Sequence, residues 1–229
     1  MISFAIVELR TGRANPLGGK GHLSAIDKQP ISGSILVGSE GLVGDQQADR
    51  RHHGGRDKAL HAYPVAHYEA WTAELPQLAD RFVAGGFGEN LVVEGVTEQD
   101  LCLGDRFRIG PVLVELSQSR QPCWKLNLRF NQCDMACRVQ TTGRTGWYFR
   151  VLEPGRIAAG TQAQLVARPH SDWSLTRVWR LLYYEPLERD TLAAFLNLQG
   201  LPESWRHLAE RRLASGQVED WNSRVDTPG

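Results

Sequence analysis

A cysteine with a cation on each side is the first feature of this chain that indicates chemistry. Cys123 follows Pro122 in the segment 117–126 (SQSRQPCWKL), with Arg120 before it and Lys125 after it. The segment predicts a strand that ends, a turn fixed by the proline, and a helix that begins at the thiol. Because positive charge and a helix N-terminus stabilise a thiolate, we expect Cys123 to act as a nucleophile or as a ligand for a soft metal. The alternative is a buried, inert cysteine, which is the common environment of this residue.

Cations alternate with glycines in the segment 50–61 (RRHHGGRDKALH). Glycine lets a ligand approach the backbone closely, and free N–H groups beside Arg and Lys suit an anion such as phosphate. The alternative is a solvated basic loop. His52, His53 and His61 have neither a paired-cysteine partner nor the spacing of a zinc site, so we do not expect zinc here.

A glycine-rich turn in the segment 85–91 (GGFGENL) presents Glu89 and Asn90 at the start of a strand. The alternative to a binding loop is a tight turn that needs positive φ angles. Leu91 stands where a dinucleotide-binding fingerprint would require its third glycine, so this motif does not predict a nucleotide site.

Hydroxyls, glycines and arginines stand next to aromatic residues in the segment 141–150 (TTGRTGWYFR). Such a loop suits a phosphate and a stacked flat ring. The alternative is a capped turn followed by core aromatics. We expect Trp147 and Phe149 in the core in either case.

Two smaller motifs favour structural roles. The segment 41–45 (GLVGD) predicts a turn in which Asp45 hydrogen-bonds the backbone of that turn. Cys133 and Cys137 lie one turn apart on a predicted helix, and we expect two packed small side chains there rather than a metal site.

The composition is that of an ordinary folded protein. Of 229 residues, 41% are hydrophobic and 23% charged, and 26 basic residues balance 26 acidic ones. This balance argues against a general binder of nucleic acids or membrane surfaces. No apolar run approaches the ~18 residues that cross a bilayer, and the first residues predict a strand rather than a secretory signal. We therefore expect a cytoplasmic chain whose cysteines are reduced.

The elements that must position these motifs are mainly strands in the first part of the chain. Short apolar runs separated by glycine turns predict a barrel or a strongly bent sheet, with strands at residues 4–9, 34–37, 89–93 and 112–117. Two helices are predicted to interrupt it, at residues 67–74 and 125–139.

The pattern changes after a predicted linker at residues 168–172. Apolar residues then recur at helical spacing in three stretches, separated by Pro186 and Pro202 and closed by Gly216. We therefore predict a β-barrel domain at residues 1–168 and a three-helix domain at residues 173–222. Three short helices bury little alone, so we expect them to pack on the barrel or on a partner.

Taken together, the motifs resemble the MOSC family. Nine short motifs carry the resemblance, and they occur in one order along nearly the whole chain: GLVGD at 41–45, HGG at 53–55, KAL at 58–60, YP at 63–64, FGENL at 87–91, GD at 104–105, PCWKL at 122–126, TGRTGW at 142–147 and PG at 154–155. The three-helix appendage is typical of one branch of that family.

The resemblance implies a mainly β fold with helices, a closed MOSC-type β-barrel followed by a small three-helix domain. It implies that the barrel binds the molybdenum cofactor, Mo-molybdopterin, and that Cys123 is the catalytic residue and the ligand of the metal. The residues expected to bind the rest of the cofactor are His53, Lys58, Gly88, Glu89, Asn90, Arg120, Lys125, Thr142, Gly143 and Arg144.

The implied activity is the reduction of N-hydroxylated compounds, including base analogues such as 6-hydroxylaminopurine. The cysteine spacings lack the pattern of an iron–sulfur site and no nucleotide motif is present, so we expect a separate redox protein to supply electrons. We expect neither nucleic acid nor membrane as a partner. Two alternatives stay open: a sulfur or molybdenum-cofactor carrier without turnover of its own, and a binding module whose helical tail recruits a partner.

Overall fold

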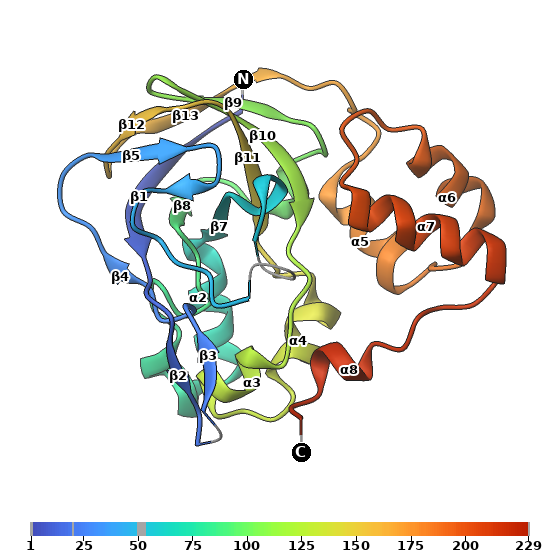
Figure 1. Cartoon of the computed structure of the whole chain (residues 1–229), viewed down its shortest axis with the longest axis horizontal. Helices are drawn as coiled ribbons and strands as arrows, with labels where there is room; N and C mark the ends of the chain where they lie inside the picture. Colours follow the sequence, from blue (N-terminus) through green and yellow to red (C-terminus); the bar gives the residue numbers. More distant parts are fainter. Residues whose placement is uncertain (1, 20, 50–53, 229) are drawn as a thin grey trace.

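A closed β-barrel forms the larger part of the molecule. The computed structural model describes residues 2–19, 21–49 and 54–228. Within them, seven strands pair in a ring, because the last barrel strand bonds both its neighbour and the first strand (Figure 1). In order around the ring these are β1 (Ser3–Thr11), β13 (Gln162–Ala167), β9 (Arg106–Ile109), β10 (Val112–Ser119), β11 (Trp147–Glu153), β7 (Leu60–Pro64) and β8 (Leu91–Glu94). The predicted barrel is confirmed.

The apolar side chains of β1 are the ones that point into the barrel, and a bulge makes this possible. Phe4, Ile6 and Leu9 are buried. Phe4 and Ile6 are two positions apart, as strict alternation requires, but Leu9 follows Ile6 by three positions. The register of β1 on β8 shifts between Ile6 and Glu8, and this bulge turns the next apolar side chain inward. A similar shift occurs between Leu116 and Gln118 on β10, next to the predicted site.

Strands β7 and β8 are parallel, whereas the other described barrel pairs are antiparallel. A parallel pair needs a crossover, and here it consists of α2 (Val65–Glu74) and the 3-10 helix η2 (Pro76–Arg81). Figure 1 shows α2 below β7 and β8. The helix predicted at 67–74 is therefore confirmed, with its start two residues earlier.

Smaller elements surround the barrel. β4 (Gln29–Pro30) extends the sheet beside β1, and β12 (Gly155–Ile157), β5 (Ile35–Gly38) and β6 (Gly41–Leu42) form a second sheet. β2 (Asn15–Leu17) and β3 (His22–Ser24) form a hairpin. Two short 3-10 helices, η1 (Arg56–Lys58) and η3 (Glu98–Asp100), lie in the loops.

The single helix predicted at 125–139 is wrong, because the structure has two. α3 (Lys125–Phe130) ends at Asn131, whose φ of 52° is left-handed, and α4 (Met135–Thr142) begins after it. Asparagine tolerates that conformation, and its N–H bonds the last turn of α3. Cys133 precedes α4 and both Cys133 and Cys137 are exposed, so the expectation that they pack is also wrong.

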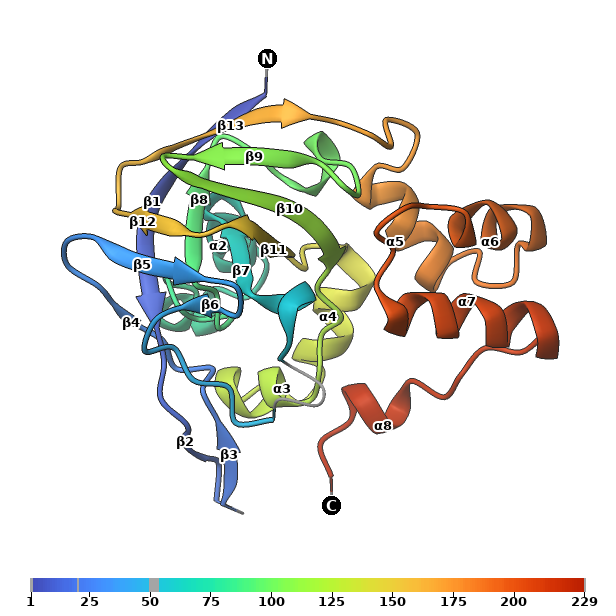
Figure 2. The same cartoon turned by 45° about the horizontal axis from the view of Figure 1, so that its top comes forward.

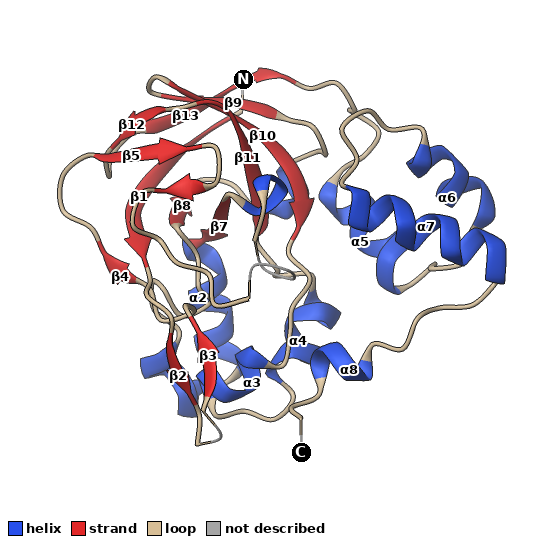
Figure 3. Ribbon diagram, in the orientation of Figure 1, coloured by secondary structure: helices blue, strands red, loops and turns tan. Residues whose placement is uncertain are grey.

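The C-terminal helices are α5 (Leu175–Tyr183), α6 (Arg189–Leu196) and α7 (Glu203–Ser215), as the sequence predicts (Figure 3). Ser174 caps α5 by accepting from the N–H of Arg177, and Gly216 ends α7 with a φ of 63°. A short fourth helix, α8 (Asn222–Val225), follows and was not expected.

One apolar core joins the barrel and the helices. The same cluster of buried side chains includes Phe107 and Phe149 inside the barrel and Val178, Phe195 and Trp205 of the helices. The expected packing of the helices on the barrel is therefore confirmed. The boundaries at 168 and 173 stay a prediction, and Arg168 in the expected linker is tied to the barrel by an ion pair with Asp105 at 2.7 Å.

A second cluster, rich in aromatic rings, fills the space around α2 and α3. Phe87 stacks on Tyr63 at 4.2 Å between ring centroids and contacts Trp71 and Phe130. Among the described residues, no helix is both long and apolar enough to cross a membrane.

Candidate active site

Cys123 lies partly exposed where two hollows meet. The first, the basic hollow, encloses about 590 Å³ when the space in its open mouth is included. It is lined chiefly by Lys28, Asp45, Lys58, His61, Gly88, Asn90, Arg120, Cys123, Lys125 and Tyr148. The second, the polar hollow, lies against the C-terminal helices. It is lined by Gln118, Ser119, Gln121, Trp124, Ser204, Ser223 and Arg224, and it shares Asp49, Lys58, Cys123, Lys125 and Tyr148 with the first.

The local chain folds as the sequence predicts around the thiol. β10 ends at Ser119, Pro122 forms the turn, and α3 begins at Lys125. The carbonyl of Cys123 accepts from the N–H of Leu126 at 3.0 Å, so the cysteine directly precedes the first helical turn.

Three of the predicted cations surround the thiol. Lys58, Arg120 and Lys125 all line the basic hollow with Cys123. Arg120 is buried, and within the described chain its Nη1 has no hydrogen-bond partner, which is costly unless a ligand supplies one. Burial is the largest influence on Lys58 and lowers the pKa of its ammonium group, against the opposing attraction of Asp57, Cys123 and Asp49.

The floor of the basic hollow is a buried ion pair that the sequence did not predict. Lys28 donates to Oδ1 of Asp45 at 2.5 Å, and Asn90 donates to Oδ2 at 3.0 Å. The N–H of Gly12 also donates to Oδ1, at 2.7 Å. The expectation that Asp45 bonds its own turn is wrong, because its carboxylate links three distant segments instead.

Two further lining residues have shifted pKa values. Burial, and to a lesser extent the charge of Arg120, holds the pKa of His61 well below its usual value, so the imidazole is neutral. Burial raises the pKa of Tyr148, so its hydroxyl stays protonated. Sequence analysis considered His61 only as a zinc ligand, which it did not favour, and it did not single out Tyr148.

Gly88 and Asn90 reach the basic hollow from the turn before β8. Gly88 has a φ of 77°, and a side chain there would come within 2.8 Å of Ile26. Glycine therefore keeps this wall open. Asn90 also accepts from the N–H of His61 at 3.2 Å, which joins the turn to β7.

Glu89, by contrast, points away from both hollows. It is fully buried and accepts from Tyr68 and from the N–H groups of Gly85 and Phe87, at 2.5 and 3.0 Å for the backbone donors. These contacts favour a role in holding the loop over the expected contact with the cofactor.

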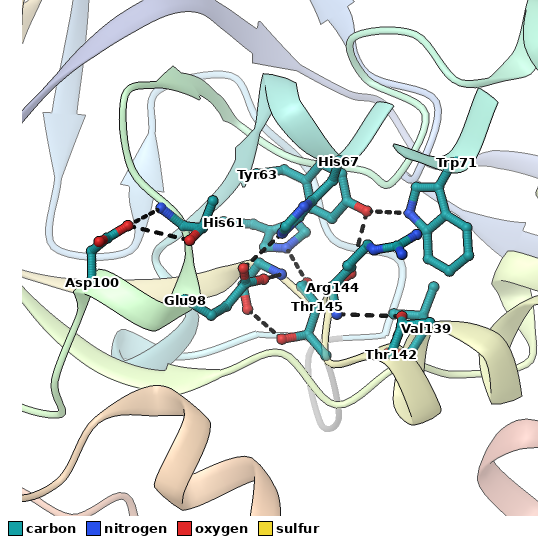
Figure 4. A network of polar contacts seen from close by, with 12 residues as sticks. His61, Tyr63, His67, Trp71, Glu98, Asp100, Val139, Thr142, Arg144 and Thr145 are labelled. Atoms are coloured by element: carbon teal, nitrogen blue, oxygen red, sulfur yellow. Dashed lines mark hydrogen bonds and ion pairs between the residues drawn. The ribbon is translucent and has the colours of Figure 1, made fainter. Parts of the chain in front are cut away.

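Thr142, Gly143 and Arg144 lie at a third, separate hollow beside α5. Figure 4 shows Arg144 next to Trp71, where its guanidinium lies 4.7 Å from the ring centroid. It also pairs with Glu74. Thr142 donates its hydroxyl hydrogen to the carbonyl of Arg138, one turn earlier in α4. The structure therefore does not bring these three residues to Cys123.

The same view shows a buried pair that orders this loop. His67 and Glu98 are bonded at 2.6 Å, and Glu98 also accepts from the N–H of Gly146 at 2.7 Å. The carbonyl of Gly146 in turn accepts from the N–H of Arg120 at 3.1 Å. The pair thus supports the backbone that carries Arg120.

His53, the remaining candidate, lies outside the described residues. In the described ranges, no group of three or more His, Cys, Asp or Glu side chains is placed to hold a bare metal ion.

Comparison with known proteins agrees with this fold. A family model described as the MOSC domain matches residues 49–164, and one described as the YiiM-like 3-alpha helix domain matches residues 173–216. The chain therefore belongs to the MOSC family. Within that family, it is similar over almost its whole length to the protein YiiM of Escherichia coli, with 38% identity over 96% of this chain and 97% of the relative.

A solved structure and a longer relative extend the comparison. The crystal structure of YiiM from Escherichia coli has a TM-score of 0.84 and 33% identity, covering 99% of this chain and all of that one. A protein of Gibberella moniliformis named "Reductase" is 36% identical over 92% of this chain, but this chain covers only 37% of that protein.

Proposed function

We propose that the chain binds the molybdenum cofactor in the basic hollow and reduces N-hydroxylated compounds of the 6-hydroxylaminopurine type. The observation that carries the proposal is the position of Cys123, partly exposed between a hollow rich in cations and a hollow rich in neutral polar groups. Membership of a family with a relative named "Reductase" supports an oxidoreductase over a passive carrier.

The residues present fit the cofactor. A bare ion needs several protein ligands, but a molybdenum that already carries dithiolene sulfur needs one more soft donor, which Cys123 offers. Arg120 and Lys125 suit the phosphate of the pterin, and Nη1 of Arg120, which has no hydrogen-bond partner among the described residues, can donate to it. Gly88 and Asn90 would face the pterin. When bound, the metal supplies the two-electron chemistry that breaks the N–O bond.

The polar hollow suits the substrate. Gln118 is buried, and its amide nitrogen has no hydrogen-bond partner among the described residues. It can therefore donate a hydrogen bond to an acceptor on a bound heterocycle. The rings of Trp124 and Tyr148 line the same hollow and offer stacking surfaces. A flat compound with ring nitrogens therefore suits this side of Cys123.

Conversion of a hydroxylamine to an amine and water consumes two electrons and two protons. Lys58 lines both hollows, and its lowered pKa makes its ammonium group a better acid than that of an exposed lysine. We assign its Nζ as the proton donor to the departing hydroxyl group. The electrons come from a separate redox protein in this proposal.

The test is the molybdenum content of the chain made in a host that produces the cofactor. We expect about one molybdenum atom per chain in the wild type and in Cys133→Ala, a matched control at an exposed cysteine, and almost none in Cys123→Ala. Full occupancy in Cys123→Ala would argue against ligation by the thiolate.

Turnover separates an enzyme from a carrier. The loaded protein is given 6-hydroxylaminopurine and an artificial electron donor, and adenine is measured. Adenine formation that needs both molybdenum and Cys123 supports a reductase. A loaded protein that forms no adenine supports the carrier of sulfur or cofactor instead.

A further inference from the structure

The C-terminal segment returns from the three-helix part to the turn that carries Cys123. After α7, the chain crosses to α8, which lies beside α3 and α4 in both Figure 1 and Figure 2. No motif in the sequence pointed to this segment.

One residue of α8 holds the chain on both sides of the cysteine. The guanidinium of Arg224 donates to the carbonyl of Pro122, and the carbonyl of Arg224 accepts from the N–H of Trp124 at 2.8 Å. The peptide groups flanking Cys123 are therefore both bonded to Arg224. Since no described side chain caps the N-terminus of α3, these bonds replace the local ones that usually fix such a turn.

Arg224 is itself held from the other side. Its second terminal nitrogen donates to Oε1 of Gln140 on α4 at 2.5 Å, and its guanidinium lies 5.9 Å from the ring centroid of Tyr183 on α5. The carbonyl of Gln140 accepts from the indole N–H of Trp179 at 2.7 Å. The guanidinium therefore links the cysteine turn to the helical part of the molecule.

A second connection keeps α8 in place. The buried side chain of Asn127 on α3 donates to the carbonyl of Val225 at 2.8 Å. Its oxygen accepts from the N–H of Ala136 at 2.8 Å. Asn127 thus fastens α8 to both α3 and α4.

We infer that Arg224 is a positioning residue, which fixes the direction of the Cys123 thiol from the C-terminal helix. A turn held at both flanking peptides presents its side chain in one direction, and a ligand or nucleophile held in place loses less entropy when it reacts. The inference deepens the proposed function, since the positioned thiol is the one assigned to the cofactor, but it concerns the geometry of the chain alone.

The test compares Arg224→Ala, Arg224→Lys and the control Arg189→Ala in the full-length, cofactor-free chain. Arg189 also donates to a backbone carbonyl, that of Leu213 at 3.1 Å, but within the three-helix part. Two readouts are measured: amide hydrogen exchange at Trp124, and iodoacetamide alkylation of Cys123 relative to the exposed Cys133 in the same molecule.

In Arg224→Ala we expect Trp124 exchange to be about tenfold faster and the Cys123-to-Cys133 alkylation ratio to change about tenfold, as for loss of a bond to a charged group. Lysine can satisfy one of the two acceptors, so Arg224→Lys should give an intermediate value. Arg189→Ala should match the wild type. In molybdenum-loaded protein, kcat of Arg224→Ala should fall about tenfold.

Unchanged exchange and an unchanged alkylation ratio in folded Arg224→Ala would overturn the inference. If that variant does not fold, Arg224→Lys decides in the same way, because wild-type values there would also overturn it. Alkylation and exchange are measured without molybdenum. A wild-type chain that binds no molybdenum would therefore contradict the proposed function but would not affect the test of Arg224.

Discussion

The ammonium group of Lys28 donates to the carboxylate of Asp45 at 2.5 Å, and both side chains are almost fully buried below the candidate cofactor site. Burial lowers the pKa of Lys28, and Asp45 is the main influence that opposes this. A buried charge without its partner is costly, so the pair gives a direct test of how the floor of the site is held.

Asp45→Ala should lower the free energy of unfolding by about 3–5 kcal/mol, because it leaves Lys28 buried and unpaired. The measurement is urea unfolding. Asp134→Ala serves as control, since Asp134 pairs with Arg138 at the surface, where loss of the pair should cost about 0.5 kcal/mol. A cost for Asp45→Ala as small as that of the control would show that the floor is not held by this pair.

The free energy of unfolding should decrease in mild acid because of the lowered pKa of His61. Its pKa is held well below the ordinary 6.5, so the unfolded chain binds a proton that the folded chain does not. Stability is therefore fully present above about pH 6.5 and is lost as the pH falls below it, at up to about 1.4 kcal/mol per pH unit. Urea unfolding at pH 7.5 and 5.5 should show a smaller difference for His61→Gln than for the wild type. Equal differences would contradict this role.

Glu89→Ala should destabilise the fold by about 3 kcal/mol or more, because two buried N–H groups and a hydroxyl lose their acceptor. Glu94→Ala, at an exposed position on β8, should cost less than about 0.5 kcal/mol. Thermal and urea unfolding of both variants check the prediction. A stable Glu89→Ala chain that had lost only its cofactor would restore the binding role that the sequence also allowed.

Arg120 and Arg144 are both predicted cofactor-binding residues, but substituting them should have different effects on retention of the cofactor. Arg120→Gln should weaken retention of the pterin about 10- to 100-fold, because Arg120 lines the basic hollow beside Cys123. Arg144→Gln should leave retention unchanged, since Arg144 lines the third hollow, where it pairs with Glu74. Fluorescence of the oxidised pterin released from equal amounts of folded protein measures the difference. Equal loss in both variants would mean that the third hollow also serves the cofactor.

The sequence predicted the parts of the site whose chemistry is local. Arg120, Cys123 and Lys125 lie within six positions, so a turn and a short helix suffice to bring them together. Lys28 and Asp45 were missed because their role depends on burial and on a contact across 17 positions. No periodicity in either segment encodes that contact.

Contacts between distant segments of the barrel were likewise not predictable from local sequence patterns. Short apolar runs predicted β1 and β10, but the closure of the barrel depends on pairing between Ser3 and Gln164, from opposite ends of the domain. A local pattern shows that a strand exists and not which strand it pairs with. The helix break at Asn131 was missed for a related reason, since asparagine is compatible with both a helix and its left-handed end.

The parallel pairing of β7 and β8 follows from the odd number of strands in the barrel. Strands that alternate in direction can close a ring only in even number, so the seven-membered ring in the described chain must contain a parallel neighbour pair. That pair forces the chain to travel from one end of the barrel to the other, outside the ring, before it re-enters. The chain re-enters the ring at the turn that brings Gly88 and Asn90 to the basic hollow. The odd strand count is therefore linked to the glycine-bearing wall of the basic hollow, and a homologue with an added barrel strand would have to build that wall by another route.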